Sequence, residues 1–461
     1  MELFELHSQM RWLRKTVADL KDELSGIQGI LANVGILQEP ALQVQIHRQR
    51  FNAVKEESNW AANLCLLDLP MHTLSRIVSW AAASDVMPSA CSAFRRIDSS
   101  TIRNHRLYIC GGMCGGYISK TAECYDSDRG TWEPLPDMAR HRHQHTTTAM
   151  CGSIYIVGGC SESGCGLNSA ECFHPSQRVW NRLPPMSQAR FRHTASALDG
   201  SLYVVGGKHA YSCHDSSERF DPTTWSWEEL PRMAEKCDGH SASIVDGDLY
   251  VVGGASGRRT LDLAQRFNPR SGVWEILSWM SHHRESHSSS VIGGVLYVVG
   301  GCSWNSPKPG DLSLGATRPL NGGRGLALSS AECYVPTQGK WQPLSHMAIA
   351  RYGHSASVVK GMIYIVGGVF GSELPCGHEV LERFDPIRGV WERLPDILGQ
   401  RISPSVTIMA GMLYVVGGYH EGSAGTDSAE RFNPSENKWE TLPRMASQRC
   451  MHSACVLIET L

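Results

Sequence analysis

Leu202-Tyr203-Val204-Val205-Gly206-Gly207 is one of seven copies of a short string in a chain of 461 residues. Every copy has leucine or isoleucine, then tyrosine, two further residues and a glycine pair. The tyrosines are Tyr108, Tyr155, Tyr203, Tyr250, Tyr297, Tyr364 and Tyr414. The glycine pairs begin at Gly111, Gly158, Gly206, Gly253, Gly300, Gly367 and Gly417. Repetition at a fixed spacing is the signature of a repeat architecture, so this string decides the fold.

Each repeat predicts four short strands. The string itself is β-branched and aromatic enough for a buried second strand, and its glycines permit positive φ and close backbone approach. A first strand of small residues precedes it, and a third strand such as Ser217–Asp221 ends at a proline. A tryptophan then begins the outer strand, where we expect it to supply buried surface between repeats. These are Trp132, Trp180, Trp227, Trp274, Trp341, Trp391 and Trp439.

This pattern resembles the kelch repeat over residues 106–461, and the resemblance implies a β-propeller. The expected fold class is an all-β, seven-bladed kelch β-propeller preceded by an α-helical N-terminal region. The repeats begin with a second strand at Arg106 and end with a lone first strand after Arg449. We therefore expect the C-terminal strand to complete the first blade and close the ring.

The seven copies can be compared with one another. Six repeats carry an arginine three residues before the first-strand histidine position, and six carry a glutamate in the third strand. The same repeat lacks both residues and has Cys237 and Gln265 in their places. The pattern predicts an ion pair inside each blade, because a lone buried partner would be costly. The alternative is that the arginines line a ligand face. The arginines are Arg142, Arg190, Arg284, Arg351, Arg401 and Arg449, and the glutamates are Glu123, Glu171, Glu218, Glu332, Glu382 and Glu430.

Histidines and cysteines raise the question of metal. The first strands carry His145, His193, His240, His287, His354 and His452, with Pro404 in the remaining repeat. We interpret them as repeat residues that pack and hydrogen-bond rather than as a metal site, and we expect no cofactor. The sixteen cysteines form no Cys-x-x-Cys pair and replace other small residues between repeats, which favours free thiols in a reducing compartment.

Residues 1–37 contain a heptad pattern that predicts a coiled coil and a homodimer. The alternative is an amphipathic helix packed on the chain's own propeller. Residues 41–65 are expected to form a helical linker. The dimer seam is Leu6, Met10, Leu13, Val17, Leu20 and Leu24.

Residues 66–98 resemble an F-box, with a Leu-Pro start and a compact apolar pattern. The resemblance implies contact with a Skp-family adaptor and, through it, a cullin. The short span from Asp85 to Phe94, interrupted by Pro88, departs from the F-box pattern. The alternative is a helical cap on the first blade. The residues implied in adaptor binding are Leu69, Pro70, Leu74, Ile77, Asp85, Val86 and Phe94.

The balance of charged residues and the lack of a long apolar run exclude some classes of function. There are 43 Lys and Arg residues against 45 Asp and Glu, so nothing attracts the chain to nucleic acid or anionic membranes, and no apolar run is long enough to span a membrane. We expect a cytoplasmic protein, with the nucleus as the alternative. The F-box resemblance implies a non-enzymatic substrate receptor of a cullin ubiquitin ligase, in which the propeller binds an unknown protein target. The alternatives are a non-ligase scaffold and a galactose-oxidase-like enzyme, for which no copper-binding Tyr/His set can be placed.

The target-binding face is expected where loops follow the glycine pairs and enter the first strands. One such loop, 303–328, is much longer than its counterparts. The candidates on this face are Arg192, Ser286, Trp304, Arg318, Arg324, Phe370 and Tyr419.

Overall fold

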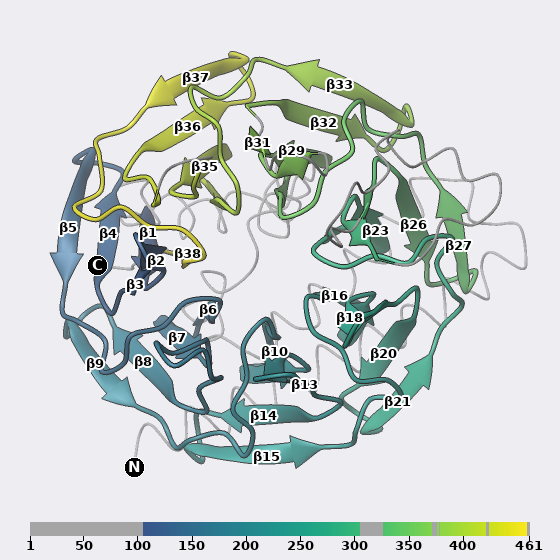
Figure 1. Ribbon diagram of the computed structural model, residues 1–461, viewed down its shortest axis with the longest axis horizontal. Coiled ribbons are helices and arrows are strands. Elements are labelled where there is room, and N and C mark those ends of the chain that lie inside the picture. Colours follow the sequence, from purple (N-terminus) through teal and green to yellow (C-terminus); the bar gives the residue numbers. More distant parts are fainter. Residues whose placement is uncertain (1–104, 305–325, 371–375, 378, 421–423, 459–461) are drawn as a thin grey trace, which may run out of the picture. The chain divides into compact units, whose positions relative to one another are not determined.

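The computed structural model describes residues 105–304, 326–370, 376–377, 379–420 and 424–458. These residues form seven four-stranded antiparallel sheets arranged as blades around a central axis (Figure 1). In every blade the strand nearest the axis pairs with the string that ends in the glycine pair. The predicted seven-bladed propeller is confirmed. The predicted helical N-terminal region lies outside the described residues.

The blades are numbered along the chain, and each is given from its inner to its outer strand. Blade 1 is β38 (Ser453–Ile458), β1 (His105–Cys110), β4 (Ala122–Asp126) and β5 (Thr131–Leu135); blade 2 is β6 (Thr146–Met150), β7 (Ser153–Val157), β8 (Ala170–His174) and β9 (Val179–Arg182); blade 3 is β10 (Thr194–Leu198), β11 (Ser201–Val205), β14 (Ser217–Asp221) and β15 (Ser226–Leu230); blade 4 is β16 (Ser241–Val245), β17 (Asp248–Val252), β20 (Ala264–Asn268) and β21 (Val273–Ile276).

The remaining blades follow the same order. Blade 5 is β22 (Ser288–Ile292), β23 (Val295–Val299), β26 (Ala331–Val335) and β27 (Lys340–Pro343); blade 6 is β28 (Ser355–Val359), β29 (Met362–Val366), β32 (Leu381–Asp385) and β33 (Val390–Leu394); blade 7 is β34 (Ser405–Met409), β35 (Met412–Val416), β36 (Ala429–Asn433) and β37 (Lys438–Thr441). Short hairpins follow five of the glycine pairs: β2 (Met113–Cys114) with β3 (Tyr117–Ile118), β12 (Lys208–His209) with β13 (Ser212–Cys213), β18 (Ala255–Ser256) with β19 (Arg259–Thr260), β24 (Cys302–Ser303) with β25 (Leu326–Ala327), and β30 (Val369–Phe370) with β31 (Cys376–Gly377).

The C-terminal strand closes the ring, as the sequence predicts. β38 pairs antiparallel with β1 over six positions, from His105 opposite Ile458 to Cys110 opposite Ser453. Closure gives β1 an inner partner, so all seven blades have four strands and β1 is not left as an open edge that other chains could pair with.

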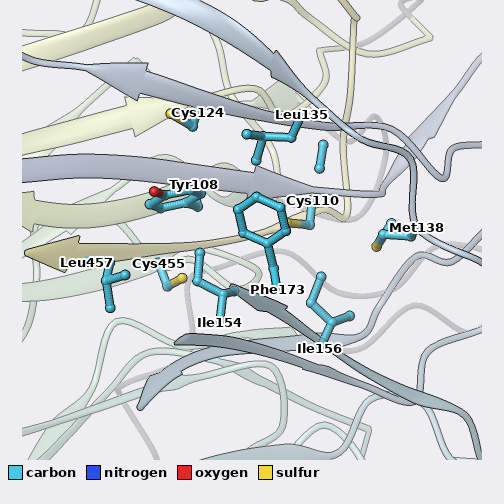
Figure 2. Packing of buried hydrophobic residues seen from close by; sticks show 11 residues of the cluster. Tyr108, Cys110, Cys124, Leu135, Met138, Ile154, Ile156, Phe173, Cys455 and Leu457 are labelled. Carbon is cyan, nitrogen blue, oxygen red and sulfur yellow. The ribbon is translucent and has the colours of Figure 1, made fainter. Parts of the chain in front are cut away.

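The core is divided into seven apolar clusters, each between two neighbouring blades. The cluster between blades 1 and 2 joins Tyr108 and Cys455 of blade 1 to Ile154 and Phe173 of blade 2 (Figure 2). Because every cluster draws side chains from two sheets, no blade buries its apolar faces alone. Stability therefore depends on the complete ring.

A belt of aromatic side chains also connects the blades. The second-strand tyrosine of one blade packs on the third-strand aromatic residue of a neighbouring blade, as in Tyr155 against Phe220, with centroids 6.1 Å apart. Phe220 in turn packs on Trp227 of its own blade at 5.2 Å.

The seven tryptophans pack on the clusters between blades, as expected; six are partly buried, and Trp439 is buried. Each also donates its indole N–H to a backbone carbonyl of the preceding blade, as Trp227 does to Pro184 at 2.8 Å. Trp132 of blade 1 donates in the same way to Pro443 of blade 7, so this outer ring of hydrogen bonds also closes.

We predict that deleting residues 449–461 prevents stable folding. The deletion removes β38 and Arg449, exposes the edge of β1 and opens the cluster between blades 1 and 2. Circular dichroism and light scattering should show loss of a cooperative melt and aggregation. A truncated chain that melts like the full chain would contradict closure by β38.

Candidate protein-binding face

Buried Arg–Glu pairs hold in place the loops that lead into the inner strands. Arg190 of blade 3 donates to Glu218 at 2.6 Å, to the Gly206 carbonyl at 2.7 Å and to the Ser216 hydroxyl at 3.0 Å. Glu218 also accepts the backbone N–H of Ser187, at 2.7 Å, in the loop that enters the blade. The predicted pairing inside each blade is confirmed in all six blades that carry both residues.

The alternative role for these arginines, a ligand face, is wrong. All six are 0 or 1% exposed, so no ligand can reach them. Their backbone carbonyls are also occupied: the Arg190 carbonyl accepts the N–H of Gly159 in the preceding blade at 2.9 Å. A side chain at the neighbouring Gly158 would place its Cβ 2.5 Å from that carbonyl oxygen, so this close approach requires glycine.

Blade 4 shows how the pair can be replaced. Gln265 keeps the bond to the entering loop by accepting the Ala234 N–H at 2.7 Å, although no arginine faces it. Cys237 occupies the arginine position, with its sulfur 3.4 Å from His240. Both charges are absent together, so no buried charge lacks a partner.

The first-strand histidines form a second, inner connection between blades. His193 Nε2 lies 3.0 Å from the hydroxyl of Thr146 in the preceding blade, and the same contact recurs for His240 with Thr194, His287 with Ser241 and His354 with Ser288. Packing is confirmed for all six histidines, which are buried, and hydrogen bonding to the preceding blade for these four. Burial lowers the pKa of all six histidines, to about 4 for His240 and about 3 for His354 and His452.

A ring of backbone hydrogen bonds surrounds the axis where the loops enter the inner strands. Six of the seven ring residues donate their N–H to the carbonyl of the ring residue in the preceding blade, as Ser286 does to Gly239 at 2.9 Å, and Met451 takes part only as the acceptor of the Gln144 N–H. All seven have positive φ, between 49° and 62°, although only two are glycine. The ring residues are Gln144, Arg192, Gly239, Ser286, Gly353, Ser403 and Met451.

The ring surrounds one opening of the central channel. We call this side of the propeller the loop face; it consists of the loops that follow the glycine pairs and the loops that lead into the inner strands. A polar cavity of about 420 Å³ occupies the axis there, lined by serines and histidines. A second cavity, of about 500 Å³, lies against the β12–β13 hairpin and includes Tyr211, Lys236 and Gly257 in its wall.

A charged cluster occupies the loop face over blades 3 to 5. Arg192 lies 3.2 Å from Asp238 and 3.0 Å from Glu285, and it contacts the Ser286 hydroxyl at 3.3 Å. Lys208 adds a second cation 3.3 Å from Asp238. Burial opposes the charge on Arg192, but Asp238 and Glu285 outweigh it and the pKa of Arg192 is raised. The cluster is a fixed polar surface beside the axis.

The structure joins three of the predicted target-binding candidates through one carboxylate. Glu285 contacts Arg192 and accepts the indole N–H of Trp304, and Ser286 follows it in the chain. Phe370 and Tyr419 lie in loops of blades 6 and 7, away from this cluster; Tyr419 exchanges backbone hydrogen bonds with Ile402. Arg318, Arg324 and the adaptor-binding and dimer-seam residues lie outside the described residues.

Sequence comparison of the repeats missed Asp238 and Glu285. The residue before the ring position is His143, Phe191, Tyr352, Ile402 or Cys450 in the other blades. Acidic residues occur there only in blades 4 and 5, and both are buried. An acidic residue at this position in only two of the seven repeats is the signal in the sequence that could have indicated the charged cluster.

Exposed aromatic side chains occur after the glycine pairs of blades 1, 3 and 5. Tyr117 is 83% exposed, Tyr211 is fully exposed and Trp304 is 47% exposed. Among the described residues, no group of three or more histidine, cysteine or acidic side chains is placed to hold a metal ion, and the thirteen described cysteines are free thiols. No helix in the described ranges is long and apolar enough to cross a membrane.

Comparison with protein families agrees with this geometry. Residues 98–301 match the KLHDC2/KLHL20/DRC7 Kelch-repeats domain, and residues 350–397 and 400–446 match the Kelch motif. The chain carries a kelch-repeat propeller. No curated protein sequence matches it. Of the solved structures that match, one is the structure of YjhT, at 15% identity and a TM-score of 0.52 over 67% of this chain and 99% of that one.

Kelch propellers are typical protein-interaction scaffolds, and the loop face of this kelch propeller has the features such a surface needs. It combines exposed aromatic side chains with a fixed charged cluster on a rigid support.

We predict that the buried ion pair is strongly non-additive. Arg190→Met should cost about 3–5 kcal/mol because Glu218 then lacks its partner, and Arg190→Met with Glu218→Gln should cost less than the sum of the two single changes. Denaturant unfolding measures all three. Glu228→Gln, which breaks the exposed pair with Arg219, is the control and should cost under about 1 kcal/mol.

We predict that acid destabilises the kelch propeller through the histidines. An unfolded histidine takes up a proton near pH 6.5, whereas folded His240 does so only at about 4. Each such histidine therefore has no effect on the free energy of unfolding above pH 6.5. As the pH falls below 6.5, it lowers the free energy of unfolding by about 1.4 kcal/mol per pH unit, until the pKa of the folded state is reached. His354→Gln should reduce proton uptake on unfolding at pH 5 by about one.

Proposed function

We propose that this kelch protein is a substrate receptor of an F-box/cullin ubiquitin ligase. The loop face would bind the target, and residues 66–98 would bind a Skp-family adaptor. No covalent chemistry is assigned to the chain, because holding a target near a ligase raises its effective concentration. The homodimer through residues 3–34 is part of the same proposal.

The observation that supports target binding is the group of exposed aromatic side chains on the loop face. Large aromatic residues are costly to leave in water and are enriched at the centres of protein interfaces. Tyr117, Tyr211 and Trp304 come from hairpins of three different blades, yet all three hairpins follow a glycine pair and so lie on one face. Trp304 contacts the charged cluster through Glu285, and Arg192 and Lys208, its partly exposed members, can fix the orientation of a partner.

The ligase part rests on the Leu69-Pro70 start and the apolar pattern that follows it. A non-ligase scaffold would use the same loop face without the adaptor. The two functions therefore differ in one measurable property, adaptor capture.

We predict that Leu69→Ala with Pro70→Ala and Ile77→Asp removes adaptor and cullin from complexes purified with the full-length protein. A few buried anchors carry most of the energy of a small interface, so the triple change should abolish capture. Proteins bound by the propeller should remain. If the unchanged protein captures no adaptor, the ligase proposal fails and the scaffold takes its place.

The converse variant tests the loop face. Tyr211→Ala with Trp304→Ala should lower recovery of propeller-bound proteins at least about tenfold while adaptor capture persists. Ile387→Ala is the control, since this side chain is 96% exposed in a turn on the opposite face. Equal recovery from the loop-face variant and the control would place the binding surface elsewhere.

A further inference from the structure

The outer strand of blade 4 differs from the six other outer strands. The residue two positions after the tryptophan is Ile276 in blade 4 and is 59% exposed. Trp279, three positions further on, is 55% exposed. At the Ile276 position the other blades carry Pro134, Arg182, Glu229, Pro343, Arg393 and Thr441, and at the Trp279 position they carry Asp137, Pro185, Arg232, His346, Asp396 and Arg444.

These substitutions matter because outer strands are sheet edges. β21 pairs with β20 on one side only, and it lies on the rim of the propeller (Figure 1). Natural proteins block such edges with proline and charge, and five of the other six blades do so at the Ile276 position. Blade 4 has an apolar residue at this position and another at the Trp279 position.

The backbone at this position is available for pairing. Leu277 donates its N–H inward to Ala264 at 2.9 Å. Because successive residues of a strand point to opposite sides, the N–H and C=O of Ile276 point away from β20. Pro134 and Pro343 lack that N–H at the same position.

We propose that β21 pairs antiparallel with β21 of a second copy of this chain, about a two-fold axis at Ile276. Ile276 then exchanges both hydrogen bonds with Ile276 of the second copy. The pairing then extends into residues 277–279, which follow β21: Val273, which is 50% exposed, comes opposite Trp279 of the second copy, and Glu275 comes opposite Leu277. The exposed apolar residues are thereby matched to one another in a single register.

The charges favour a second copy as the occupant. A two-fold interface must be complementary to itself. In this register no two like charges are opposite, and Glu275 keeps its ion pair with Arg266, at 2.5 Å. An axis one residue earlier would place the two Glu275 carboxylates opposite each other, which is unfavourable. A short edge pairing buries little area, so the association is weak and reversible.

The first test measures self-association of the full-length protein by sedimentation. Ile276→Arg should raise the dissociation constant at least about tenfold, because two like charges would meet across the axis. Arginine already occupies this position in blades 2 and 6, so the fold accommodates it. Thr441→Arg adds the same charge at the same position of blade 7 and should change nothing. Both substitutions are also made with Leu13→Asp and Leu20→Asp, which removes any contribution from the predicted coiled coil.

Cysteine cross-linking tests the register directly. Ile276→Cys faces itself across the axis and should form a covalent dimer with a mild oxidant at least about ten times faster than Arg393→Cys, its counterpart in blade 6. A mixture of Val273→Cys and Trp279→Cys should cross-link faster than either alone. Equal rates for Ile276→Cys and Arg393→Cys would overturn the proposal. Unchanged self-association of Ile276→Arg would also overturn the proposal. It would do so even if Ile276→Arg weakened binding of a strand from a different protein, because β21 would then pair with that protein and not with a second copy.

Discussion

The buried guanidinium beneath the loops of six of the seven blades is the interaction on which the rest of the molecule depends. Taking an arginine and a glutamate out of water is unfavourable, and good geometry with further hydrogen bonds is needed to offset it. Here the guanidinium of Arg190 reaches Glu218, Gly206 and Ser216 of its own blade, while its backbone carbonyl binds Gly159 of the preceding one. One residue therefore connects two blades and the loop between them.

That arrangement explains why variable loops can stand on a constant frame. The glycine pairs lie so close to the arginine carbonyls and to the histidines that a Cβ there would collide with them, whereas the residue just before the ring position differs between blades. Blades 4 and 5 place Asp238 and Glu285 there, and blades 3, 6 and 7 place Phe191, Tyr352 and Ile402. The sequence can thus vary at this position without disturbing the support.

The repeated features could be predicted from the sequence because seven copies serve as their own comparison. Residues that recur at the same position of each repeat predict the number of blades and the closure by β38. The Arg–Glu pairs are predicted because the arginine and the glutamate are replaced in the same repeat, by Cys237 and Gln265. The charged cluster could not be predicted in this way, because Arg192, Asp238 and Glu285 come from three blades and meet only when the ring is formed. The indole hydrogen bonds to the preceding blade could not be predicted either, because the acceptor is a backbone carbonyl whose position depends on how two blades pack.

Closure by β38 also determines when this protein can fold during its synthesis. The loop residue Arg449 binds Gly111, 338 positions earlier in the chain. At about 5–20 residues per second, a ribosome takes roughly 20–70 seconds to cover that distance. Throughout this interval blade 1 has three strands and an open inner edge, and the growing chain displays a β1 surface that other nascent chains can pair with. Blade 1 is therefore completed only after the rest of the propeller has been synthesised, and until then β1 lacks the partner that keeps it from pairing with other chains.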